Sequence, residues 1–239
     1  MTDYETLSVK RYQVLSGSAL KLIACISMLS DHLGRFYLNR FSWATQVWFT
    51  VAGRNISLEM LMFMFGRFAF PIFAFLLVVG FEHTRSKMRY GLSLFVLALV
   101  SEIPFNLMIG QSLFYPTQNV AFTWLLGLIA LSGLTYFKKK PVIALAILVV
   151  LFMVSRYLQA DGRTAGYLFI LLMYGLRKEN LIRCVAPPVL LQMKAMVFLS
   201  LVLTLLYNGQ RGFIKTPFMK YCFYAFYPVH MLVIYLIAR

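Results

Sequence analysis

Long apolar runs alternate with short polar or basic segments along this chain. The runs are about 18 to 22 residues long, which is the length a helix needs to cross a hydrocarbon core roughly 30 Å thick. The pattern therefore predicts an all-α fold, a polytopic integral membrane helical bundle with about eight transmembrane helices. The expected spans lie near residues 15–37, 60–82, 90–109, 119–137, 141–158, 164–176, 188–207 and 221–238.

Two segments depart from this regular pattern. The run 164–176 is short for a span, and the apolar stretch from Trp43 to Ala52 is too brief to cross a membrane. Trp43 and Trp48 favour a position at the membrane interface, where tryptophan is enriched. No internal repeat or linker interrupts the pattern, so we expect residues 1–239 to form a single membrane-embedded domain.

The composition agrees with a membrane protein. Hydrophobic residues make up 61% of the chain and charged residues only 13%, well below the roughly 25% that is typical of soluble domains. A formal net charge of +15 would suggest nucleic-acid binding in a soluble protein. In a polytopic protein, however, basic residues gather in short cytoplasmic loops. We therefore expect the lipid bilayer, and no nucleic acid, among the partners.

One set of alternate loops carries most of the basic residues and identifies the side that we expect to face the cytoplasm. Its members are Lys10, Arg11, Arg85, Lys87, Arg89, Lys138, Lys139, Lys140, Arg177, Lys178, Arg183 and Arg239. The other set holds Arg40, Arg54, Arg163, Arg211, Lys215 and Lys220. The bias predicts that both termini are cytoplasmic, although the basic loop 208–220 opposes it.

Several ionisable side chains lie inside the expected spans, where a charge near the bilayer centre costs at least about 2.5 to 3.5 kcal/mol. Such residues either line a cavity or join helices through polar contacts. Both interpretations are open for an isolated residue such as Lys194, whereas a set of seven favours a functional site. The seven are Lys21, Asp31, His32, Arg67, Glu102, Lys194 and His230.

The first span carries three of these residues. Lys21 and His32 are eleven positions apart, so on an α-helix they differ by about 1100°, roughly 20° beyond three full turns. They therefore lie on one face, with an axial separation of about 16 Å. His32 is either a reactive base or a neutral, structural histidine. Asp31 either forms a local i,i+4 ion pair with Arg35 or contacts a neighbouring helix and tunes the site electrostatically.

Seven short blocks follow one another in a characteristic order. They are Leu20-Lys21 to Ser30-Asp31-His32-Leu33-Gly34, Gly66–Phe75 (GRFAFPIFAF), Ser101–Phe105 (SEIPF), Asn119–Thr123 (NVAFT), Asp161-Gly162, Tyr207–Gly212 (YNGQRG) and Lys220–His230. In this order the blocks resemble the TraX family, membrane proteins associated with N-terminal acetylation of conjugative pilin. The spacing of Lys21 and His32 also resembles the basic-x10-His signature of the wider membrane acyltransferase superfamily.

This resemblance implies an acyl-CoA-dependent acetyltransferase of the bacterial cytoplasmic (inner) membrane. It would move an acetyl group from cytoplasmic acetyl-CoA to an amine or hydroxyl of a protein or glycan acceptor in the envelope, such as the N-terminus of pilin. His32 is expected to act as general base, with Asp31 as a further catalytic residue. Donor binding is expected at Lys21, Arg67, Arg85, Lys87 and Arg89. Further site residues, carried over by motif position, are Glu102, Asn119, Asp161, Asn208, Arg211 and His230.

Two other classes of function remain open at this point. Intramembrane Lys, Asp, Glu and His residues also mark the ion pathways of a small transporter or proton-coupled permease. In a membrane assembly scaffold, the same residues would only join helices. Because His32, His83 and His230 share no metal-binding spacing, we expect no metal.

Overall fold

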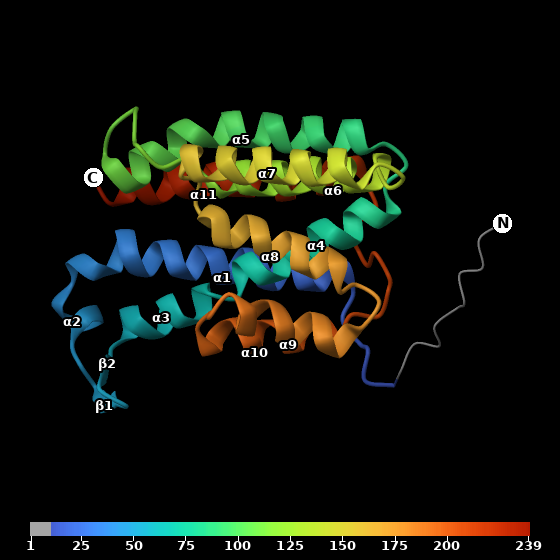
Figure 1. Cartoon of the computed structure of the whole chain (residues 1–239). Helices are drawn as coiled ribbons and strands as arrows, with labels where there is room; N and C mark the ends of the chain where they lie inside the picture. The colour runs from blue at the N-terminus through green and yellow to red at the C-terminus, as the bar shows by residue number, and fades with distance from the viewer. Residues whose placement is uncertain (1–10) are drawn as a thin grey trace.

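The computed structural model describes residues 11–239, and Lys10 of the orientation argument lies outside the described residues. Figure 1 shows a helical bundle in which most helices run side by side along one direction. The elements, in chain order, are α1 (Gly17–Phe36), η1 (Leu38–Arg40), α2 (Ser42–Thr45), β1 (Phe49–Val51), β2 (Arg54–Ile56), α3 (Leu58–Gly66), α4 (Ala69–His83), α5 (Lys87–Gly110), α6 (Val120–Tyr136), α7 (Pro141–Leu158), α8 (Arg163–Gly175), α9 (Asn180–Leu190), α10 (Ala195–Leu205) and α11 (Pro217–Ile237).

Side chains cap the starts of several helices. At each of these starts a hydroxyl or amide oxygen accepts a hydrogen bond from a backbone N–H of the first turn, which has no partner within the helix. The capping residues are Ser16, Ser57, Ser86, Asn119 and Thr216. Local sequence therefore determines where α1, α3, α5, α6 and α11 begin.

A short antiparallel hairpin lies where the sequence predicted an interfacial segment. Strand β1 pairs with β2, and the two residues between them, Ala52 and Gly53, have φ angles of 49° and 75°. Positive φ at both positions is the geometry of a tight type I′ turn, which glycine adopts without strain. The hairpin lies at one end of the bundle, beyond α2 and α3 (Figure 1).

The prediction of a helical membrane protein is confirmed in part, because four helical segments of the described chain are long and apolar enough to cross a membrane. They are Leu58–His83, which joins α3 and α4, together with α5, α7 and α11. The count of about eight spans is not confirmed. Helix α1 carries charged residues, and α8, α9 and α10 have 13, 11 and 11 residues, fewer than the roughly 20 that a span needs.

Helices α9 and α10 form a helical hairpin instead of the single span predicted at 188–207. The chain turns between Leu190 and Ala195, where Gln192 has a φ of 50°. Pro187 and Pro188 lie inside α9, and the turn that follows them is closed by the backbone N–H of Met193, which donates to Pro188 O over 2.8 Å. Each helix is about 16 Å long, roughly half the thickness of the hydrocarbon core.

The hairpin starts and finishes at the same end of the bundle, because α9 runs inward from that end and α10 runs back to it. The segment before α9 is joined to the end of α4 by an ion pair between Arg177 Nε and Glu82 Oε1, 2.9 Å apart. The residue after α10 is joined to the start of α1, where Leu15 N donates to Leu206 O over 2.8 Å. The hairpin therefore enters the bundle and returns without crossing it.

This return places the two ends of the described chain at opposite ends of the bundle (Figure 1). The far end of α11 lies beside the segment that follows α1, where Arg40 donates to the carbonyl of Ala238. This arrangement of residues 11–239 differs from the predicted one, in which both termini lie on one side, and the side of the membrane that each terminus faces stays a prediction. The hydropathy pattern predicted that 188–207 crosses the membrane once, and this extra crossing reversed the side assigned to the residues after 207.

The return of the α9–α10 hairpin also explains the position of the basic loop 208–220, which opposed the predicted charge bias. We call the end of the bundle that holds the start of α1 the basic end. Loop 208–220 lies there, next to α1, because Gly17 N and Ser18 N donate to Gln210 O and Arg211 O over 2.8 and 2.9 Å. Arg211, Lys215 and Lys220 thus join the other basic loops, as the positive-inside rule predicts.

Candidate functional site

Two histidines from opposite ends of the chain meet inside the bundle. His32 Nδ1 of α1 lies 2.7 Å from His230 Nε2 of α11. Their rings are parallel within 5°, with centroids 5.0 Å apart, so the hydrogen bond lies close to the plane of both rings. Phe226, one turn before His230, stacks on that ring at 4.9 Å. We call His32 and His230 the histidine pair.

The hydrogen bonds of the pair define which nitrogen remains available. His230 Nδ1 lies 2.8 Å from the carbonyl oxygen of Phe226, and because a carbonyl only accepts, this nitrogen carries the hydrogen. Nε2 of a neutral His230 then accepts, so His32 Nδ1 is the donor in the pair. Nε2 of a neutral His32 consequently keeps a free lone pair. That nitrogen is suited to accept a proton or to act as a nucleophile.

Asp31 contacts both its own helix and a neighbouring one, as the two sequence hypotheses required. Its Oδ1 lies 3.1 Å from Arg35 Nε and 3.1 Å from Arg67 Nη2. Gly66 permits this arrangement, because any side chain there would overlap the Asp31 carboxylate. Arg35 and Arg67 also interact electrostatically with His32. Asp31 therefore holds two cations near the histidine pair and does not contact the imidazole directly.

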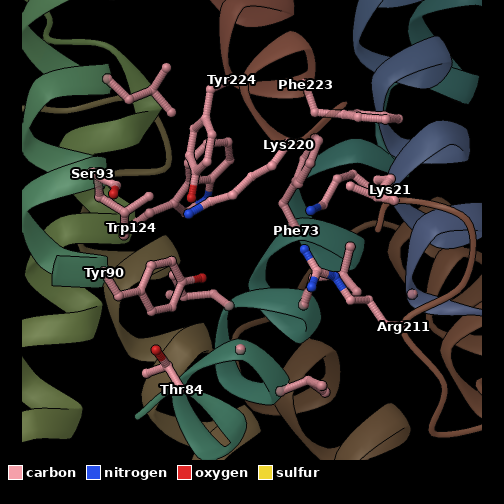
Figure 2. A pocket seen from close by; sticks show the side chains of 18 of the residues that line it. Lys21, Phe73, Thr84, Tyr90, Ser93, Trp124, Arg211, Lys220, Phe223 and Tyr224 are labelled. Atoms are coloured by element: carbon pink, nitrogen blue, oxygen red, sulfur yellow. The ribbon is translucent and has the colours of Figure 1, made fainter. Parts of the chain in front are cut away.

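A cavity of about 890 Å³ opens at the basic end, which is in the range of sites that hold a small molecule or cofactor. We call it the basic cavity. Among the described residues 11–239 its lining contains no Asp or Glu, and Lys21 interacts electrostatically with both Arg211 and Lys220. In Figure 2 the charged ends of Lys21 and Arg211 point toward the open centre of the cavity. The cationic lining residues are Lys21, Arg85, Arg89, Arg211 and Lys220.

Aromatic side chains line the rest of the basic cavity. Tyr90, Trp124, Phe73 and Tyr224 surround its centre in Figure 2. Tyr207 lies at its rim on the loop after α10, where partial burial raises the pKa of the phenol. That hydroxyl stays protonated and can donate a hydrogen bond. The cavity thus combines cations with apolar walls that carry a few polar groups.

The basic cavity ends one helical turn from the histidine pair, and a second cavity begins one turn beyond it. Met28 of α1 and Phe226 of α11 line the basic cavity. Phe36 of α1 and Ile234 of α11 line the second cavity, which has a volume of about 460 Å³ and lies at the opposite end of the bundle. Each of these residues is four positions from one of the histidines. The histidine pair therefore lies between the two cavities.

The expected donor-binding residues divide into two groups. Lys21, Arg85 and Arg89 line the basic cavity. Lys87 instead donates to the carbonyl oxygens of Phe81 and Thr84, so it closes the end of α4. Arg67 lies at the junction of α3 and α4, where it contacts Asp31 of α1, and it does not line the cavity.

The residues carried over by motif position also separate. Arg211 lines the basic cavity and His230 completes the histidine pair. Glu102 and Asn119 bind each other, with 2.6 Å between Oε2 and Nδ2. The Asp161 carbonyl accepts from Thr123 Oγ1 over 2.7 Å, which joins the start of α8 to α6.

Asn208 has a structural contact as well. Its backbone N–H donates to Leu15 O over 2.9 Å, and its Oδ1 accepts from the N–H of Gln210 over 3.0 Å. Asn208 therefore shapes the loop that presents Arg211. Lys220, Tyr90 and Tyr224 line the cavity but were not among the expected site residues. The position of Lys220 at the start of the last block was a signal for it, whereas nothing in the sequence distinguished the tyrosines.

The fold and the site define a helical membrane protein in which a histidine pair lies just beyond the inner end of a basic cavity. The family model described as TraX protein matches residues 16–238, so the chain belongs to the TraX family and the inferred resemblance is confirmed. The chain is also 28% identical, over 242 residues, to the probable fimbrial assembly protein FimC, serogroup H1, of Dichelobacter nodosus. That alignment covers 90% of this chain and 93% of the relative. No solved structure matches the chain.

Proposed function

We propose that this protein is a membrane acetyltransferase that takes acetyl-CoA into the basic cavity and uses His32 as its base. The observation that carries the proposal is the position of the histidine pair one helical turn beyond the inner end of a cation-lined cavity. An assembly scaffold would not need a histidine whose second nitrogen is left free by its partner. A proton-coupled permease could use that nitrogen as well, and release of CoA from acetyl-CoA distinguishes the enzyme from it.

The lining of the basic cavity suits the two halves of a CoA thioester. Lys21, Arg211 and Lys220 are placed to hold phosphate groups, since clustered cations bind phosphates through charge-assisted hydrogen bonds. The aromatic walls suit the uncharged pantetheine arm. The rise of about 16 Å from Lys21 to His32 sets the length that this arm must cover.

The chemistry requires one base. The acceptor amine or hydroxyl attacks the thioester carbonyl, a new C–N or C–O bond forms, and His32 Nε2 takes the acceptor's proton. The C–S bond then breaks, and the proton passes from His32 to the departing CoA thiolate. His230 stabilises the imidazolium through the hydrogen bond from His32 Nδ1. An acetyl-His32 intermediate would use the same nitrogen as a nucleophile.

The acceptor belongs to the bacterial envelope in this proposal. The relative from Dichelobacter nodosus is named a probable fimbrial assembly protein, which supports a pilin-related role and an acceptor such as a pilin N-terminus. The second cavity gives an acceptor its own approach to the histidine pair from the end opposite the donor. Acetyl transfer would then proceed across the inner membrane.

The decisive experiment is release of CoA from acetyl-CoA by the purified protein in nanodiscs, with envelope extract as the source of acceptor. His32→Ala should lower the rate about 100- to 10,000-fold, the usual contribution of a general base. Tyr157→Ala, an exposed change on α7 outside both cavities, is the control. Mass spectrometry of the extract identifies the acetylated product. Wild-type turnover by the folded His32→Ala protein would refute the assignment.

Orientation is tested separately by cysteine labelling in intact cells. With the basic end in the cytoplasm, Lys139→Cys should be protected from an impermeant reagent. Ser112→Cys, in the loop between α5 and α6 at the other end, should react, and a tag after Arg239 should be accessible from outside. Protection of all three positions would contradict this topology.

A further inference from the structure

Three cations surround one aromatic ring outside the two cavities. The charged groups of Arg35, Arg67 and Lys194 lie 4.4, 4.3 and 5.7 Å from the centroid of Phe63. They come from α1, from the junction of α3 and α4, and from the turn between α9 and α10. We call Arg35, Arg67 and Lys194 the cation cluster.

The cation cluster is not neutralised within the described residues 11–239. Asp31 binds both arginines through the single atom Oδ1, and Lys194 belongs to none of the ion pairs of this part of the chain. Arg67 Nε is buried without a hydrogen-bond partner. Asp161 interacts electrostatically with both arginines, which still leaves three cations against two carboxylates.

The depth of Lys194 makes this excess charge costly. The residue lies in the turn of the α9–α10 hairpin, about 16 Å from the basic end, and its side chain is exposed. A cation at such depth costs at least about 2.5 to 3.5 kcal/mol unless it meets water or an anion. Because the hairpin turns back halfway, neither of its two helices extends into the half of the bilayer beyond this turn.

The surroundings of the cluster favour a lipid as that molecule. Leu190 at the end of α9 and Leu199 of α10 lie on the hairpin that carries Lys194 and are 64% and 53% exposed. In a membrane such exposed apolar side chains contact acyl chains, so a lipid can place its chains against the hairpin and its headgroup at the cations. A guanidinium group binds phosphate oxygens through paired hydrogen bonds, and a free lysine adds a point charge.

We propose that Arg35, Arg67 and Lys194 bind the phosphate group of an anionic lipid from the leaflet opposite the basic end. The bound phosphate supplies the missing negative charge, and its acyl chains fill the space beside the hairpin turn. The site lies next to the histidine pair, since both arginines interact electrostatically with His32. Lipid binding needs no acyl donor, so it stands whether or not the protein transfers acetyl groups.

The test compares lipid retention by wild-type and variant proteins after extraction from nanodiscs that contain equal amounts of phosphatidylglycerol and phosphatidylcholine. Native mass spectrometry should show phosphatidylglycerol retained by the wild type and reduced about tenfold by Lys194→Ala, equivalent to roughly 1.4 kcal/mol. Lys194→Arg should retain it, because the cation is kept. Lys178→Ala removes an exposed lysine at the basic end and should bind as the wild type does.

Three results would overturn the proposal. Equal retention of the two lipids would show that the site does not select a lipid with a net negative charge. Unchanged retention by Lys194→Ala would remove the cluster from the site. Displacement of phosphatidylglycerol by excess inorganic phosphate would assign the cations to a free anion. Acetyl-CoA turnover measured on the same samples separates failure of this lipid site from failure of the proposed enzymatic activity.

Discussion

The Glu102–Asn119 pair and the histidine pair both lie inside this apolar bundle, and they differ in which nitrogen atoms they leave without a hydrogen bond. In the Glu102–Asn119 pair, Asn119 Nδ2 donates to Glu102 Oε2 and to Ala98 O, at 2.6 and 2.8 Å, and Asn119 Oδ1 accepts from Ala121 N at 3.0 Å. The amide is fully satisfied. In the histidine pair, one ring nitrogen of His32 has no bond within the pair.

The difference separates structural from reactive polar groups. The Asn119 amide joins α5 to the start of α6, and both of its N–H donors are used in doing so. An unsatisfied pair stays available for chemistry. The same contrast holds for two lysines, because Lys87 is bound by carbonyls at the end of α4, whereas Lys21 points into the basic cavity. In each comparison the hydrogen-bond partners distinguish the two roles.

The largest effect in this comparison is expected at His230. His230→Phe keeps an aromatic ring but removes the acceptor that fixes the tautomer of His32. Loss of a group that orients another typically lowers activity about 10- to 100-fold. We therefore expect kcat to fall in this range, with little change in the KM for acetyl-CoA.

His230→Gln is the matched variant, because its amide oxygen can accept the same hydrogen bond. It should recover part of the lost kcat and move the pH profile of kcat toward that of the wild type. Equal loss of activity in the Phe and Gln variants would leave His230 with a packing role only.

A smaller effect is expected for Lys21. Lys21→Ala should raise the KM for acetyl-CoA about tenfold, equivalent to roughly 1.4 kcal/mol of lost binding, while kcat changes little. Lys87→Ala should leave this KM unchanged and lower the thermal unfolding midpoint instead, since Lys87 closes the end of α4. Isothermal titration with CoA checks the first effect independently. The comparison fails if both variants bind CoA equally well.

Much of the fold was predictable because hydrophobic runs and capping residues are local signals. The common face of Lys21 and His32 followed from helix geometry alone. The meeting of His32 with His230 did not, because the two residues are 198 positions apart and their contact depends on how α1 packs against α11. The family blocks contained both residues but gave no distance between them.

The number of crossings could not be counted from hydropathy for a related reason. The length of an apolar run shows how much of the chain the bilayer can bury. It does not show whether that segment crosses the bilayer or turns back. The polar residues Gln192 and Lys194 inside the run were the local sign that 188–207 is not one helix. The displaced basic loop 208–220 was the second sign, since a correct topology should gather such loops on one side.

The smallest effect on catalysis is expected from the satisfied pair. Asn119→Ala leaves the Ala98 carbonyl and the Ala121 N–H without their present partners, and each buried polar group left unpaired costs about 1–3 kcal/mol. The protein should therefore unfold at a lower temperature in detergent and insert in lower yield. Turnover per folded molecule should remain close to that of the wild type, because neither residue lines the basic cavity. Glu102→Gln, which keeps a carbonyl oxygen as acceptor, should lose less stability than Asn119→Ala. A large drop in turnover by folded Asn119→Ala protein would show that filled hydrogen bonds do not distinguish structural from reactive groups in this bundle.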